Sequence, residues 1–301
     1  MERKCDIMST FFKDKISMYT CNFNLLEDLV STKAEVSDYY AWLRDRYKDY
    51  FSSASSDQKN KFIIRYYRAK KLMYSAAQMF AEAQCVKSES CVVAYYYLSY
   101  YALFQAMQAN LLISVAYDDN KVLMLSHDNV RTYFDEEFCK NRKCPMDDDI
   151  ITQLENLRNY REYYSYAMPF NLTEEAIIDD ATIEKLIKLC CELLNFRLFV
   201  FYLEIGKGIA LDASHLDSLK EYMYESCNRL DDSRVFYDDA DANFWQELVL
   251  YKGADILPIT LSFEHDFDEY GTYDWNVYEQ MGIPRTGHIT SKALSLIYDA
   301  I

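Results

Sequence analysis

Residues 90–117 read SCVVAYYYLSYYALFQAMQANLLISVAY and contain no charged side chain. A stretch of this length is long enough to span a membrane as a helix. Tyrosines fill its first half from Tyr95 onward, and Gln105, Gln108 and Asn110 lie near its middle. A membrane span usually has an excess of Lys or Arg on one side, and the flanks of this stretch show none. The stretch therefore predicts a helix buried inside a protein, and no membrane partner is expected.

The composition around this stretch also predicts helices. The chain holds only 6 Gly and 4 Pro among 301 residues, whereas proteins with many tight turns use these residues freely. Glycine-rich phosphate loops are absent from the sequence, which excludes the common nucleotide folds that depend on them. The predicted fold class is mainly α, with long helices and few connections. Apolar residues at helical spacing predict helices at residues 24–31, 35–51, 59–84, 88–116, 147–166 and 173–203.

Two breaks divide the chain. The small polar run 52–57 ends an N-terminal helical segment, residues 1–56, and Asp57 is a candidate cap for the next helix. All six glycines lie beyond residue 205, which predicts a boundary between a bundle at 57–205 and an acidic extension at 206–301. Alternating apolar residues predict one short strand at 256–263 in this extension.

The net charge of −16 is unevenly distributed. Residues 1–146 carry 20 Lys or Arg and 18 Asp or Glu, whereas residues 147–301 carry 12 and 30. Any nucleic-acid site is therefore expected in the first half of the chain. Two interpretations of the acidic half stay open. It is either a well-solvated surface or a mimic of nucleic acid that covers a basic surface.

The nine cysteines form no CxxC pair and no Cys/His zinc spacing. Met1 is followed by charged residues without an apolar segment, so no signal peptide is expected and a reducing cytoplasm fits best. The acidic run 264–269 matches no metal-binding template and is expected to be a solvated loop. Neither a metal nor a cofactor is predicted.

Three segments in the middle of the chain stand in a characteristic order. Residues 94–112 contain Tyr100-Tyr-Ala-Leu-Phe-Gln-Ala, residues 126–138 open with Ser126-His-Asp-Asn, and residues 154–166 read LENLRNYREYYSY. Together they resemble the prokaryotic branch of the HEPN family, the higher-eukaryote and prokaryote nucleotide-binding domain. The pattern of that branch runs YYAxFHAxxALL, then a Ser/Thr-His helix start, then LxxLRxxADY. The resemblance covers roughly residues 60–205.

The resemblance implies an antiparallel helical bundle that pairs into a homodimer. Family members with an Arg-x4-6-His motif are metal-independent ribonucleases, many of them bacterial toxins or defence effectors. RNA or a nucleotide, and an antitoxin or regulatory protein, are the partners that it implies. The chemistry has a physical basis, since a His can take the proton of a ribose 2′-hydroxyl while an Arg stabilises charge on the phosphorane.

The family motifs transfer to particular residues of this chain. Arg161 matches the family arginine and Tyr166 the closing tyrosine, and both are candidate catalytic residues. Ser165 stands where the family has Asp or His, and Gln105 replaces the His of the first motif. His127, the only histidine in the resembling region, is the candidate base.

Arg158 and Tyr101, together with Ser165 and Gln105, are candidate RNA-binding residues. Structural roles compete with these assignments: Arg161 can pair with a neighbouring acid such as Glu162, and the mid-helix tyrosines can pack in a core. Two functions therefore stay open. One is a ribonuclease of the toxin or defence type with a non-standard base, and the other is a non-catalytic module that binds RNA, a nucleotide or a protein.

Overall fold

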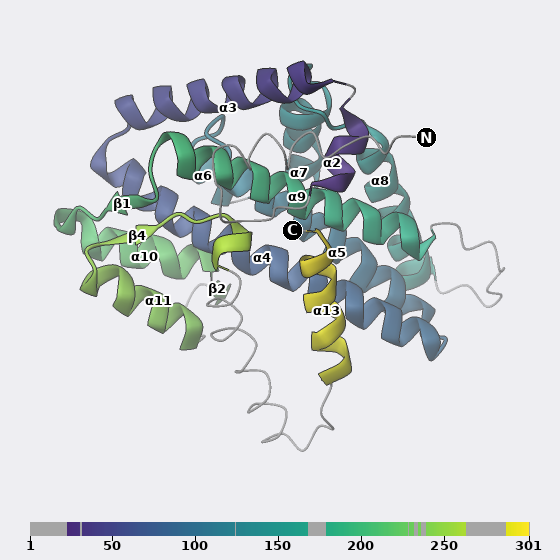
Figure 1. Ribbon diagram of the computed structural model, residues 1–301. Helices are drawn as coiled ribbons and strands as arrows, with labels where there is room; N and C mark the ends of the chain where they lie inside the picture. The colour runs from purple at the N-terminus through teal and green to yellow at the C-terminus, as the bar shows by residue number, and fades with distance from the viewer. Residues whose placement is uncertain are drawn as a thin grey trace.

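A computed structural model of the chain describes residues 23–30, 32–123, 125–167, 179–227, 229–231, 234–235, 239–262 and 287–300. Helices make up most of these residues (Figure 1). The strands within them form two small antiparallel pairs. The prediction of a mainly α fold is confirmed.

The centre of the molecule is a hairpin of two long helices, α4 (Ser56–Ser88) and α5 (Val92–Leu112). Ser55 caps α4: its hydroxyl accepts from the amide of Gln58, whose side chain accepts from the Ser55 amide. The cap is thus Ser55 and not Asp57. Most side chains of α5 are buried, as its uncharged sequence predicts. Within the described residues, no helix has the length and apolar character needed to cross a membrane.

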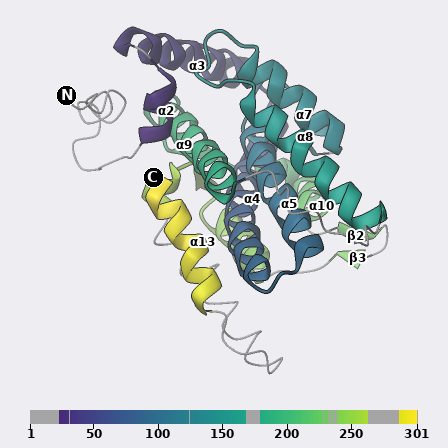
Figure 2. The same ribbon diagram turned by 90° about the vertical axis from the view of Figure 1, so that its right-hand side faces the viewer.

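Helices flank this hairpin on both sides (Figure 2). On one side of α5 lie α7 (His127–Phe134) and α8 (Asp149–Glu162), and on the other lies α9 (Asp180–Glu204). The Ser126 hydroxyl accepts from the amide of Asn129 and caps α7, as predicted from the sequence. Two π-helical turns continue α7 and α8, and two helices lie before α4 in the part of the chain that the structure describes. These elements are η1 (Asp135–Cys139), η2 (Tyr163–Ala167), α2 (Asn24–Leu29) and α3 (Lys33–Ser53).

The described parts of residues 206–301 share one hydrophobic core with the bundle. Ile209, Leu219 and Ile297 are buried members of that core. Both α10 and α13 pack against α4. The elements here are β1 (Gly208–Ala210), η3 (Ala213–His215), α10 (Leu216–Cys227), β2 (Arg229–Asp231), β3 (Arg234–Val235), α11 (Asp239–Leu250), β4 (Gly253–Asp255) and α13 (Gly287–Ala300). β1 pairs with β4 and β2 with β3.

The prediction of a strand at residues 256–263 is wrong in position. The strand, β4, ends at Asp255, and residues 259–262 form a helical turn. Pro258 begins this turn, where its fixed φ and missing N–H are tolerated, and its carbonyl accepts from the amides of Leu261 and Ser262. The buried Ile256 and Ile259 are three residues apart, which is a helical spacing, whereas a strand buries every second residue.

The carboxyl end of α5 lies in the interior, where its last carbonyl groups need partners. Arg197 of α9 donates from Nη1 to the Asn110 carbonyl at 2.6 Å. Arg65 of α4 donates from Nε to the Leu112 carbonyl at 2.7 Å, and also to that of Ser114. Both arginines are buried. Two buried cations therefore satisfy carbonyls at the negative end of the central helix.

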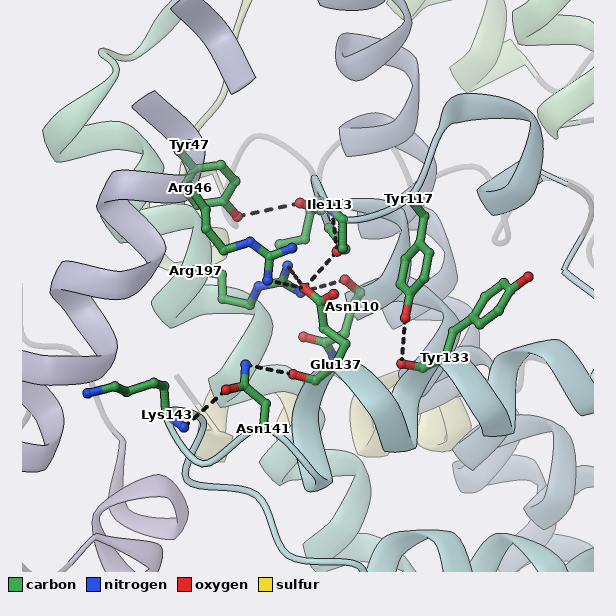
Figure 3. Close-up of polar contacts among 12 residues, drawn as sticks. Arg46, Tyr47, Asn110, Ile113, Tyr117, Tyr133, Glu137, Asn141, Lys143 and Arg197 are labelled. Carbon is green, nitrogen blue, oxygen red and sulfur yellow. Dashed lines mark hydrogen bonds and ion pairs between the residues drawn. The ribbon is translucent and has the colours of Figure 1, made fainter. Parts of the chain in front are cut away.

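A buried carboxylate completes this polar interior (Figure 3). Glu137 projects from the π-helical turn η1 and accepts from the Ser114 hydroxyl at 2.7 Å. Its Oε1 lies 3.4 Å from Nη1 of Arg46 and 3.8 Å from Nη2 of Arg197. This network connects α3, the end of α5, α9 and η1, and it therefore helps to fix the position of α5 in the bundle.

A second buried acidic side chain holds the short helix α2. Phe23, at the start of α2, offers no side-chain cap. Glu192 of α9 takes that place and accepts from the amides of Leu26 at 2.8 Å and Leu25 at 3.2 Å. Burial raises the pKa of Glu192 to about 8, against the opposing effect of these two hydrogen bonds.

We expect the Glu192→Gln variant to change how stability depends on pH. Because the folded-state pKa lies above the unfolded one, the wild type loses stability as pH rises from the ordinary carboxyl range to about 8. The variant lacks this titrating group. Its free energy of unfolding, relative to that of the wild type, should therefore rise by at most about 1.4 kcal/mol for each pH unit. Urea denaturation between pH 5 and 8 measures this. Glu184→Gln, at the exposed face of α9, is the control, and equal slopes for Glu192→Gln and the wild type would contradict the prediction.

Candidate functional site

His127 opens α7 and points its ring at the tyrosines of α5. Its Nδ1 lies 2.7 Å from the Tyr100 hydroxyl, and its ring centroid lies 4.6 Å from that of Phe104. Burial lowers the pKa of His127, and the positive charges of Arg161 and Arg158 lower it further. The imidazole is therefore neutral near pH 7 and able to accept a proton.

Arg161, in the last turn of α8, reaches the same tyrosines. Its guanidinium carbon lies 4.5 Å from the ring centroid of Tyr100, a cation–π contact, and Nη1 donates to the Tyr101 hydroxyl at 3.4 Å. Its side chain is only 12% exposed, and its Nε is buried with no partner in the described part of the chain. His127 and Arg161 thus meet at Tyr100, although they are far apart in the sequence.

Acidic side chains hold both arginines of α8 in place. Glu162 accepts from Nε of Arg158 at 2.9 Å and from Nη2 of Arg161 at 3.2 Å through the same oxygen. Asp128, next to His127, accepts from Nη1 of Arg158 at 2.8 Å. The hydrogen bond from Arg158 lowers the pKa of Glu162, which is therefore ionised at neutral pH. The ion pair of Arg161 with Glu162 that the sequence allowed is present.

The remaining predicted residues lie outside these contacts. Tyr166 is 79% exposed on η2, and the half-buried Ser165 precedes it. Gln105 lies one helical turn beyond Tyr101 on α5, and its Oε1 is buried without a partner among the described residues. The structure therefore brings together four of the predicted residues, His127, Arg158, Arg161 and Tyr101. Tyr166, Ser165 and Gln105 do not join them.

Tyr100 is the residue whose role the sequence pattern obscured. It is buried, as core packing predicts, yet its hydroxyl contacts His127 and its ring lies under Arg161. Burial raises the pKa of Tyr100 to about 12, so its hydroxyl stays protonated at neutral pH. Only the juxtaposition of three helices reveals this role, because the apolar neighbours of Tyr100 in the sequence indicate core.

The cluster combines a neutral imidazole with two guanidinium groups next to the buried Tyr100 and the half-buried Tyr101. Such a set can accept a proton and stabilise negative charge on a phosphate. In the part of the chain that the structure describes, no group of three or more His, Cys, Asp or Glu side chains is placed to hold a metal ion. No protein-family model, curated protein or solved structure matches this chain.

Proposed function

We propose that this chain is a HEPN-like RNA-binding protein of the prokaryotic toxin or defence type, and that it cleaves RNA without a metal. The meeting of His127 from α7 and Arg161 from α8 at Tyr100 supports this proposal. A proton acceptor and a cation in one cluster are the groups that such cleavage needs. Homodimerisation and control by an antitoxin or other regulatory protein belong to the proposal, because the resemblance to the family implies them.

His127 is the general base in this proposal. When Nδ1 carries the proton and donates to the Tyr100 oxygen, the lone pair on Nε2 is free to accept the proton of a ribose 2′-hydroxyl. The 2′-oxygen then bonds to the adjacent phosphorus while the bond from phosphorus to the 5′-oxygen breaks. The departing 5′-oxygen takes a proton from water. The products are a 2′,3′-cyclic phosphate and a free 5′-hydroxyl.

Arg161 stabilises the negative charge that develops on the phosphorane oxygens. Its present partner, the Glu162 carboxylate, is itself 41% exposed and marks where an anion binds this guanidinium. A phosphate oxygen offers the same charge and a similar hydrogen-bond geometry as that carboxylate. Arg158 binds the same carboxylate oxygen, and in this proposal it supplies a second guanidinium for the RNA backbone.

The low exposure of Arg161 favours one alternative. A guanidinium that is 12% exposed and already paired with Glu162 is as well suited to holding neighbouring side chains in place as to catalysis. Ser165 also stands where the family carries Asp or His. Under this alternative the chain is a non-catalytic module that recognises RNA, a nucleotide or a protein partner.

Incubation of the purified protein with total RNA and a tRNA pool in EDTA separates the two functions. The proposal expects products with 2′,3′-cyclic phosphate ends. Alanine at His127 or at Arg161 should lower the cleavage rate about 100-fold or more, because each removes one half of the chemistry. Rates are read from 5′-labelled RNA on denaturing gels.

Two control variants remove an arginine and a histidine that lie outside the cluster. Arg131→Ala removes an arginine of α7 that pairs with Glu155, and His215→Ala removes an exposed histidine of η3. Both should cleave at the wild-type rate. RNA that binds through Arg161 without being cut would support the non-catalytic module. The absence of both binding and cleavage would refute any function on RNA and leave only a module that recognises a nucleotide or a protein partner.

A further inference from the structure

A row of side chains runs along one face of α5 toward the candidate site. The row consists of Val93, Tyr97, Tyr101 and Gln105, which follow one another at intervals of four residues and so lie on one side of the helix, with about 6 Å between neighbours. The ring centroids of Tyr97 and Tyr101 are 4.7 Å apart. Because Tyr101 accepts a hydrogen bond from Arg161, Tyr97 is the next aromatic ring outward from the site.

Tyr97 is open to solvent and borders a hollow. The residue is 48% exposed, which is high for a large aromatic side chain that also packs on a neighbouring ring. The hollow has a volume of 640 Å³ and is lined by residues 90–94 with Tyr97 and Leu98. None of these residues carries a charge. A flat, uncharged group fits this hollow better than a phosphate does.

The Arg161 side of the row has the opposite character. Arg158 and Arg161 provide two guanidinium groups on α8, and His127 lies beyond Tyr101. The face thus offers two guanidinium groups at one end, where Glu162 and Asp128 pair with them, and an apolar surface with an exposed aromatic ring at the other. A nucleotide has this same division, with a charged phosphate joined to a planar base.

We propose that Tyr97 is a stacking platform for a nucleobase of single-stranded RNA, next to the phosphate held by Arg161. This inference rests on the proposed function, since it assumes that RNA binds at the cluster. The base stacks on the Tyr97 ring and its edge enters the hollow at the start of α5. A duplex cannot use this platform, because its bases are already stacked on each other.

Fluorescence anisotropy with a labelled unstructured 12-nucleotide RNA tests the platform at low salt. Tyr97→Ala should weaken binding about 10-fold, within the range measured for loss of one stacked base. Tyr97→Phe and Tyr97→Trp keep a ring and should bind like the wild type. Tyr251→Ala, which removes an exposed tyrosine at the end of α11, is the matched control and should also bind like the wild type.

The outcomes separate this inference from the proposed function. An RNA of the same length with abasic sites should bind the wild type and Tyr97→Ala equally, since it has no base to stack. If Arg161→Ala weakens binding and Tyr97→Ala does not, the platform is refuted and the RNA site stands. If neither variant changes binding, both are refuted. Equal losses for Tyr97→Ala and Tyr97→Phe would assign the effect to the hydroxyl and overturn stacking.

Discussion

Replacement of Arg197 by methionine is expected to lower the free energy of unfolding by about 3–5 kcal/mol, the cost of removing one partner of a buried ion pair. The change leaves the Asn110 carbonyl without its 2.6 Å donor and removes a positive charge that faces Glu137. Neither group can reach water, because both residues are buried. Urea denaturation followed by circular dichroism measures the loss.

Two further variants define the cause of this loss. Arg131→Met removes an arginine that is 42% exposed in its side chain, and we expect its cost to stay below about 1 kcal/mol. The double variant Arg197→Met with Glu137→Leu removes both charges, so it should cost clearly less than the sum of the two single variants. An Arg197→Met variant as stable as the wild type would show that this buried network adds nothing to the fold.

Replacement of Arg65 by methionine is expected to cost a similar amount, about 3 kcal/mol or more. Its guanidinium donates to the carbonyls of Leu112 and Ser114 and pairs with Asp119 at 3.0 Å. Without it, the carboxyl end of α5 keeps its buried carbonyls but loses their donors. Hydrogen exchange should show faster opening of the last turn of α5, and thermal denaturation should show a lower Tm.

Arg65→Lys is the matched variant, because it keeps the charge. One ammonium group lacks the planar fork that reaches three acceptors at once, so we expect an intermediate loss of stability. Equal stabilities of Arg65→Lys and the wild type would mean that charge alone matters at this site. These two predictions concern function as well, since the same helix carries Tyr100 and Tyr101 to the candidate site.

Much of the fold could be predicted from local signals. The uncharged run at residues 90–117 predicted a buried helix, and α5 is that helix. Ser126 predicted the start of α7, because a side-chain oxygen at that position satisfies a free backbone amide. The strand at 256–263 failed because alternation of Leu257, Ile259 and Leu261 also fits a short helical turn once Pro258 starts it.

The sequence predicted four residues of the candidate site, His127, Arg158, Arg161 and Tyr101, but neither the role of Tyr100 nor the arrangement. The sequence singled out His127 and Arg161, but it left open whether each packs, pairs or binds. The pairing of Arg161 with Glu162 and the contact of His127 with Tyr100 depend on how α5, α7 and α8 lie against one another. Side-chain spacing within one helix carries no information about that packing.

Spacing, capping and the absence of charge along continuous segments predicted most of the helices before residue 205 and the buried character of α5. The helices α10, α11 and α13 were not predicted. The packing of the helices was needed to show that Arg65 and Arg197 donate to carbonyls at the end of α5, and that His127 and Arg161 both contact Tyr100. These contacts join residues on separate helices, and their geometry arises when the apolar faces of those helices pack together.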